Sequence, residues 1–210
     1  MDRPLSKLER RIIDIAYKHK LSHLSSCLTA VNMIDNIYKV KKLEEPFILS
    51  NGHAGLALYC ILEKLYLKDA EALLEKHGIH PHYDEEAGIW ASTGSLGQGV
   101  PIAVGMAIAD RKSNVWLLTS DGEMAEGSCW EALRVAGEQR LDNLRVMVNA
   151  NGTGAYGKIE QELLDTRLQM FFPTLVVRSN MYAFPDYLQG IDGHYHTLTE
   201  DEYKELIKYG

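Results

Sequence analysis

The chain has 210 residues, of which 46 % are hydrophobic and 24 % are charged, and its formal net charge is −7. This composition is typical of a globular protein and excludes disorder or a fibrous repeat along the whole chain. The negative charge argues against a nucleic-acid binder, because such proteins gain most of their affinity for duplexes from a basic surface.

Helical and strand patterns alternate along most of the chain. Apolar residues at helical spacing predict helices over residues 5–20, 28–40, 54–67, 69–76, 98–109 and 126–138. Short apolar runs predict buried strands over residues 46–50, 115–119 and 144–148. This alternation predicts an α/β fold with a mainly parallel sheet flanked by helices.

Residues 77–94 are predicted to form a long loop, a feature that is usually functional when it interrupts a compact domain. Past Gly157 the pattern is weaker, and a strand over 174–180 and a terminal helix over 200–209 are predicted there. No linker or repeat divides the sequence. We therefore expect a single domain over residues 1–210.

The cysteines are an odd number, widely spaced among apolar or small neighbours: Cys27, Cys60 and Cys129. This pattern predicts buried free thiols in a reducing compartment. The N-terminus lacks the apolar core of a signal peptide, and the longest uncharged stretch, 87–109, holds too many glycines and polar residues for a membrane span. We expect a cytoplasmic protein that contacts no membrane.

Two polar loops follow predicted strands. Asp121-Gly122 closes the strand over 115–119, and Asn151 follows the strand over 144–148. Because parallel strands end at the same edge of a sheet, the two side chains are expected to lie close together. One carboxylate and one amide oxygen can hold a Mg²⁺ ion bound to a diphosphate. Asp121-Gly122 or Asn151-Gly152 alone would indicate a simple turn. Their combination, in this order along the chain, favours the metal site.

Four ordered blocks of sequence cover roughly residues 8 to 157. They are Leu21-Ser22-His23; Phe47-Ile48-Leu49-Ser50-Asn51-Gly52-His53-Ala54; His80-Pro81 with Ser92-Thr93-Gly94-Ser95-Leu96-Gly97-Gln98-Gly99; and Asp121-Gly122 with Glu126-Gly127, Trp130-Glu131-Ala132, Leu141-Asp142-Asn143-Leu144 and Asn151. Together they resemble the thiamine-diphosphate-binding domain of transketolases. The chain departs from that pattern at Ser22 and Ser120, where the family usually has glycine.

The resemblance implies a thiamine-diphosphate-binding fold and a set of cofactor and metal ligands. The implied cofactor-binding residues are His53, Gly94, Leu96, Asp121, Gly122, Glu123 and Asn151. The implied ligands of Mg²⁺ or Ca²⁺ are the side chains of Asp121 and Asn151 and the carbonyl oxygen of Thr153.

The resemblance also implies catalytic residues: His23, His53, His80 and Glu126. The imidazoles would line the substrate channel, where proton transfers to and from sugar oxygens suit their pKa near ~6.5. Glu126, with Glu131, would join a carboxylate network across a subunit interface. The remaining histidines, at positions 19, 77, 82, 194 and 196, are expected to be structural.

By this resemblance the chain is the diphosphate-binding subunit of a split transketolase-like enzyme. It would transfer a two-carbon ketol unit from a sugar or sugar-phosphate donor to an aldehyde acceptor. A separate pyrimidine-binding subunit would complete an α2β2 assembly. Residues 100–109, which are rich in alanine and other small residues, are a candidate interface helix or an ordinary core helix. Past Gly157 only Asp192-Gly193-His194 matches, so a C-terminally shortened domain is expected.

Two other functions stay open. One is a noncatalytic cofactor-binding or regulatory paralogue, and the other is a subunit of a thiamine-diphosphate-dependent acyl transferase. The predicted metal ligands and histidines favour catalysis over the first, because a decayed site would be free to lose them. Histidines that suit hydroxylated donors argue against the second.

Overall fold

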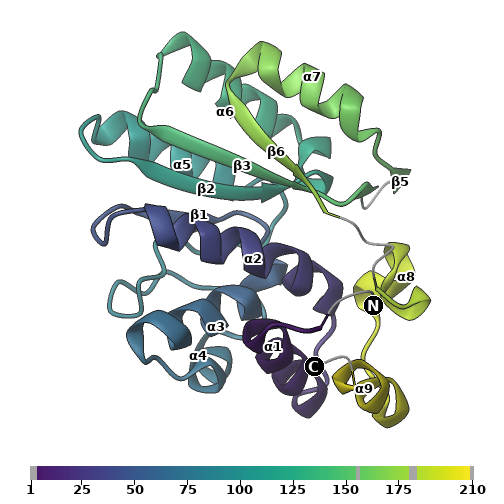
Figure 1. Ribbon diagram of the computed structural model, residues 1–210. Helices are drawn as coiled ribbons and strands as arrows, with labels where there is room; N and C mark the ends of the chain where they lie inside the picture. Colours follow the sequence, from purple (N-terminus) through teal and green to yellow (C-terminus); the bar gives the residue numbers. More distant parts are fainter. Residues whose placement is uncertain (1–3, 155–156, 180–183, 209–210) are drawn as a thin grey trace.

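A parallel sheet lies between two groups of helices in the computed structural model, which describes residues 4–154, 157–179 and 184–208 (Figure 1). Its strands are β1 (Phe47–Leu49), β2 (Val115–Ser120), β3 (Leu144–Ala150) and β6 (Thr174–Arg178), in the spatial order β1-β2-β3-β6. All three strand pairs are parallel. The predicted α/β fold is confirmed.

The helices fall into two layers and a C-terminal group. They are α1 (Lys7–Lys18), α2 (Leu24–Val40), α3 (Gly55–Tyr66), α4 (Ala70–His77), α5 (Gly99–Ala109), α6 (Gly127–Glu138), α7 (Gln161–Phe171), α8 (Gly190–Tyr195) and α9 (Glu200–Ile207). Helices α1 to α4 cover one face of the sheet and α5 to α7 the other (Figure 1). No helix of the described residues is long and apolar enough to cross a membrane.

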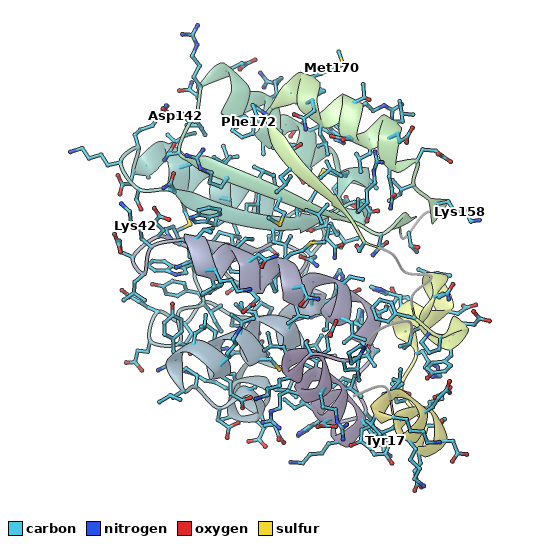
Figure 2. All side chains as sticks on the ribbon, viewed as in Figure 1. Tyr17, Lys42, Asp142, Lys158, Met170 and Phe172 are labelled. Carbon is cyan, nitrogen blue, oxygen red and sulfur yellow. The ribbon has the colours of Figure 1, made fainter. Side chains whose placement is uncertain are left out.

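Each face of the sheet has its own apolar core. The core under α1 to α4 includes Ile12, Ile34 and Tyr59, and the core under α5 to α7 includes Leu133 and Leu168. Figure 2 shows side chains filling both layers, whereas Met170 points away from α7 into solvent. Strands that are covered on both faces have near-continuous apolar sequences, which explains why short apolar runs predict them.

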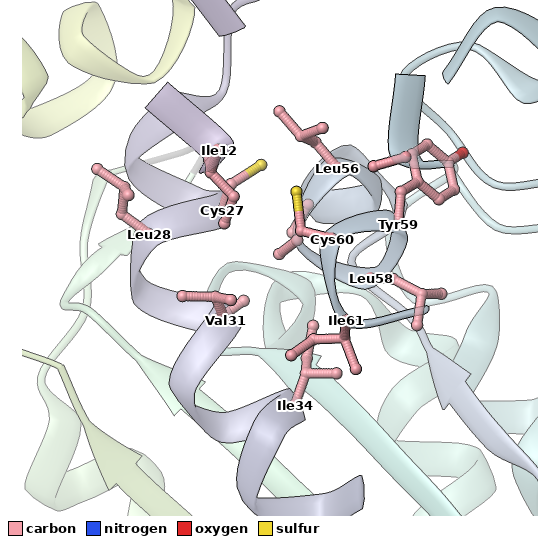
Figure 3. Close-up of a cluster of buried hydrophobic side chains, with 14 of the residues drawn as sticks. Ile12, Cys27, Leu28, Val31, Ile34, Leu56, Leu58, Tyr59, Cys60 and Ile61 are labelled. Atoms are coloured by element: carbon pink, nitrogen blue, oxygen red, sulfur yellow. The ribbon is translucent and has the colours of Figure 1, made fainter. Parts of the chain in front are cut away.

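The three cysteines are buried and free, as predicted. Cys27 on α2 and Cys60 on α3 lie among aliphatic side chains where these two helices pack together (Figure 3). Cys129 belongs to the core on the other face of the sheet. They act as small hydrophobic residues in these positions.

The elements that differ from the sequence prediction include three helices and the antiparallel pair of β4 (Thr153–Gly154) and β5 (Gly157–Lys158). Helix α2 begins at Leu24 rather than at 28, because Ser25 and Ser26 are buried despite their weak helix propensity. Helix α7 is not predicted, although Leu164 and Leu168 form a buried pair at helical spacing. Helix α8 has six residues, too few for a periodic pattern. Residues 180 and 209, the ends of two predicted elements, lie outside the described residues.

The C-terminal elements return to the edge of the sheet where the strands end. Helix α8 lies near the carboxyl ends of the strands, and α9 packs beside α1 (Figure 1). The rings of Tyr17 and Tyr203 stack at 4.2 Å between centroids, and the Tyr203 hydroxyl donates to Asp14 at 2.9 Å. These contacts hold α9 against α1, while α8 contacts the loop that follows β3.

Candidate functional site

The loops after β2 and β3 are joined by hydrogen bonds to the backbone and side chain of Asp121. Ser120 and Asn149 pair in register, and the Asp121 amide donates to the Asn149 carbonyl at 3.0 Å. The Asp121 carboxylate accepts from the amides of Gly122 at 3.0 Å and Gly152 at 2.6 Å. The expected proximity of the two loops is therefore present, and its cause is the parallel register of β2 and β3.

The oxygen atoms around Asp121 have the chemistry that Mg²⁺ or Ca²⁺ prefers. The Thr153 carbonyl oxygen lies close to the turn at Asp121-Gly122, since a Cβ atom added at Gly122 would stand 3.6 Å from it. The Asn151 side-chain oxygen accepts from the Thr153 amide at 2.8 Å, which orients it in the same loop. Burial raises the pKa of Asp121 to about 6, a cost that a bound cation would offset. The donor set fits a divalent cation.

A cavity of about 380 Å³ opens beside this turn. Its lining residues are His23, Ser25, Ser26, His53, His80, Gly94, Leu96, Ser120, Asp121, Gly122, Asn151, Thr153, Gly154, Gly190, Ile191, His194 and Tyr195. The wall combines the oxygen cluster near Asp121 with several imidazoles. It has the shape and mixed polarity of a small-molecule site.

The histidines of the cavity come from separate segments of the chain. The His23 and His53 rings lie 5.4 Å apart between centroids. Two effects lower the pKa of His23 to about 4 and that of His53 to about 3. The larger is burial, and the smaller is repulsion by the neighbouring imidazoles. Both rings are therefore neutral near pH 7. His80 reaches the same cavity from the long loop, together with Gly94 and Leu96.

His23 has a left-handed backbone conformation with φ 65°, which is uncommon for a residue with a side chain. It stands directly before the first residue of α2. The Ser22 hydroxyl and His23 Nδ1 form a hydrogen bond of 2.6 Å. Strain of this kind clusters at functional sites, where surrounding contacts hold the residue in place.

Glu123 occupies a different place from the other predicted cofactor-binding residues. Its side chain is buried and does not line the cavity in the part of the chain that the structure describes. One carboxylate oxygen accepts from the Ser50 hydroxyl at 2.6 Å and the Gly97 amide at 3.0 Å. The other accepts from the Thr119 hydroxyl at 2.8 Å and the Ser120 amide at 3.0 Å. The carboxylate thus joins the ends of β1 and β2 to the loop before α5.

Glu126 and Glu131 lie on the α6 side of the site. Glu126 precedes the first residue of α6 and is half-buried, and it is likewise outside the cavity wall of the described residues. Glu131 lines a surface groove between α5 and α6. The roles expected for them across a subunit interface stay predictions, because a single chain does not test them.

Sequence reasoning missed several residues of the cavity wall, and those with polar side chains include Ser25, Ser26, His194 and Tyr195. The serines fall in the first turn of α2, which the predicted helix leaves out. His194 is expected from the sequence to be structural, although it belongs to the matching triplet Asp192-Gly193-His194. Because the helix and strand patterns are weak after Gly157, the sequence does not indicate which way the His194 side chain points.

Replacement of Glu123 by glutamine should destabilise the chain by about 2–4 kcal/mol. Glutamine has one acceptor oxygen where glutamate has two. Its NH₂ group would therefore face the backbone amide of Gly97 or of Ser120, and two hydrogen-bond donors would meet. Urea unfolding measures the loss. Glu138→Gln, at a solvent-exposed ion pair on α6, is the control and should change stability by less than ~0.5 kcal/mol. Equal stability of the two variants would contradict this account of Glu123.

The neutral imidazoles predict a pH dependence of folding. An unfolded histidine gains a proton near pH ~6.5, whereas His23 stays neutral down to about pH 4 and His53 to about pH 3. Through these two groups the unfolded state binds more protons in this window, so their contribution to stability falls as the pH is lowered from ~6.5 to about 4. Urea unfolding at several pH values should show a shallower fall for the double variant His23→Gln/His53→Gln than for the parent or for His82→Gln, on the exposed loop. Parallel curves would refute the lowered pKa values.

Curated relatives of the chain include subunits of transketolases. It is 31 % identical to an apulose-4-phosphate transketolase subunit of Phocaeicola vulgatus, over 74 % of this chain and 62 % of that protein. It is 37 % identical to "6-deoxy-6-sulfo-D-fructose transketolase subunit SqwG" of a Clostridium species, over 70 % of this chain and 54 % of the relative. The chain thus spans about half to three fifths of the length of these relatives.

Solved transketolases share the fold. The structure from Campylobacter jejuni matches 96 % of this chain and 41 % of its own chain, with a TM-score of 0.73 and 22 % identity. The structure from Leishmania mexicana matches 82 % of this chain and 35 % of its own, with a TM-score of 0.69 and 21 % identity. The model of the family described as transketolase, thiamine diphosphate binding domain, matches residues 32–173. Since that match covers more than half of the sequence, the chain belongs to the transketolase family of thiamine-diphosphate-binding domains.

Proposed function

We propose that the chain is the diphosphate-binding subunit of a two-subunit transketolase. It would transfer a two-carbon ketol unit from a ketose or ketose phosphate to an aldehyde acceptor. The observation that carries the proposal is one cavity with an oxygen cluster at Asp121 beside neutral imidazoles. The relatives that bear the name of transketolase subunits support it.

The cofactor end of the site is the turn at Asp121. The Asp121 carboxylate, the Asn151 amide and the Thr153 carbonyl would hold Mg²⁺ or Ca²⁺, and the Gly122 amide and His53 would contact the diphosphate. Gly94 and Leu96 would contact the ring of the cofactor through their backbone. When bound, thiamine diphosphate supplies a carbanion centre for cleaving and forming carbon–carbon bonds beside a carbonyl.

The substrate end of the site is the histidine wall. Neutral imidazoles can both accept and donate hydrogen bonds, so His23, His53 and His80 would hold sugar hydroxyl groups and move protons at their oxygens. Glu123 would act as a positioning residue, since its two oxygens are taken by donors within the protein. Glu126 would join a carboxylate network with the partner.

The partner would be a pyrimidine-binding subunit in an α2β2 assembly. The Phocaeicola relative is itself named as one subunit of its enzyme, which supports a separate second chain. The groove between α5 and α6, which includes Gly105, Ile108 and Glu131, is the surface that we assign to this contact. Three buried free thiols fit a reducing compartment such as the cytoplasm.

Removal of the Asp121 carboxylate should abolish metal-dependent cofactor binding. Asp121→Ala takes away the charged ligand of the cation, so thiamine diphosphate should bind no better with Mg²⁺ than with a chelator. Calorimetric titration of the complex of both subunits measures this affinity. Asp142→Ala, on an exposed turn before β3, is the matched control and should bind like the parent. Unchanged affinity in Asp121→Ala would sink the metal assignment.

The reaction itself is tested by co-expressing the chain with the product of its neighbouring coding sequence. The complex should transfer ketol units from at least one donor among fructose 6-phosphate, xylulose 5-phosphate, apulose 4-phosphate and 6-deoxy-6-sulfofructose. His80→Ala should keep the cofactor affinity and lower kcat by about 10²-fold, because it removes one proton-transfer group. A complex that binds the cofactor but leaves every ketose intact would be the noncatalytic paralogue, and turnover of acyl donors alone would indicate an acyl transferase.

A further inference from the structure

His194 on α8 lies in the histidine wall, although the sequence alone indicates a structural role for it. Its ring is 4.4 Å from that of His23 and 5.0 Å from that of His53, between centroids. Both contacts are edge-on, and all three rings line the same cavity. Position 194 also lies beyond residue 173, where the family match ends. The fold therefore adds an imidazole that the family match does not include.

Helix α8 is held firmly enough to place this ring. A Cβ atom at Gly193 would stand 2.3 Å from the Leu188 carbonyl carbon, so the helix can approach the preceding turn only with glycine there. The His194 carbonyl accepts from the His23 amide at 2.9 Å. That bond also ties down the strained backbone of His23. The two histidines are thus positioned by one shared contact.

The ring nitrogens of His194 and His23 have matching surroundings. The Ser26 hydroxyl and His194 Nδ1 are 3.2 Å apart, just as the Ser22 hydroxyl and His23 Nδ1 are 2.6 Å apart. Because a serine occupies each Nδ1, Nε2 is the nitrogen that each ring can offer to a ligand. Within the described residues, no group of three His, Cys, Asp or Glu side chains is arranged to hold a metal ion.

The charge of the cavity wall indicates what these nitrogens would bind. None of the described lining residues is Lys or Arg, so apart from a cation held at Asp121 the wall would offer no positive charge to a carboxylate or a phosphate group. Burial lowers the pKa of His194, as it does for His23 and His53. Neutral nitrogens and serine hydroxyls are suited to alcohol groups, which donate and accept hydrogen bonds without charge.

We propose that His194 is a further substrate-contacting residue, which binds a hydroxyl group of the ketose donor through Nε2 and is oriented by Ser26. The inference rests on the proposed function and deepens it, because it assigns the uncharged, hydroxylated part of the donor to this wall. Charged ends of the donor would lie outside it.

Paired variants of similar size test the hydrogen bond. In the complex of both subunits, His194→Leu should lower kcat/KM for the best ketose donor by about 10- to 100-fold, since it removes the polar nitrogen and leaves a hydroxyl unpaired. His194→Gln offers a polar group near the Nε2 position and should recover most of that loss. Ser26→Ala should lower kcat/KM in the same direction by about 3- to 10-fold. Thiamine diphosphate affinity and the melting temperature should stay at the parent values in all three.

His196→Leu is the matched control, because His196 pairs with Glu202 at 2.8 Å and does not line the cavity of the described residues. It should keep the parent kcat/KM. Parent-like kcat/KM in His194→Leu, equal losses in the Leu and Gln variants, or a parallel loss of cofactor affinity would each overturn the assignment of His194 alone. A parent complex that transfers no ketol unit from any ketose would instead overturn the proposed function, and this inference with it.

Discussion

The buried carboxylate of Glu123 is the interaction on which the site depends. It accepts four hydrogen bonds of 3.0 Å or less from the ends of β1 and β2 and from the loop before α5. These segments are separated in sequence, and a single side chain brings their polar ends to one place. Because a buried carboxylate is stable only when its oxygens are satisfied, each segment is held in one arrangement. Asp121, two residues earlier, is then held at the cavity.

The cavity separates two kinds of chemistry over a short distance. At one end the oxygens of a carboxylate, an amide and a backbone carbonyl lie beside Gly122. At the other end neutral imidazoles and serine hydroxyls form an uncharged polar wall. In the function that we propose, the first end would hold a cation with its diphosphate and the second would bind a sugar. A parallel sheet allows this division because loops from several strands meet at its carboxyl edge.

Strain and packing at the start of α2 connect the two halves of the chain. His23 keeps a left-handed conformation because its amide is bound by the carbonyl of His194, a residue near the other end of the sequence. Helix α9 in turn rests on α1 through Tyr17 and Tyr203. Helices α8 and α9 therefore help to hold the cavity wall in place.

The sequence by itself determined the sheet, most of the helices and the proximity of the two loops that carry Asp121 and Asn151. Apolar runs and helical periodicity are local signals, and parallel strands must end at one edge. Only the tertiary structure decided that Glu123 points inward and that His194 points into the cavity. The direction of a polar side chain depends on which distant donors surround it, such as Ser50 for Glu123 and Ser26 for His194. Contacts between residues far apart in the chain leave no periodic pattern, so they exist only once the chain has folded.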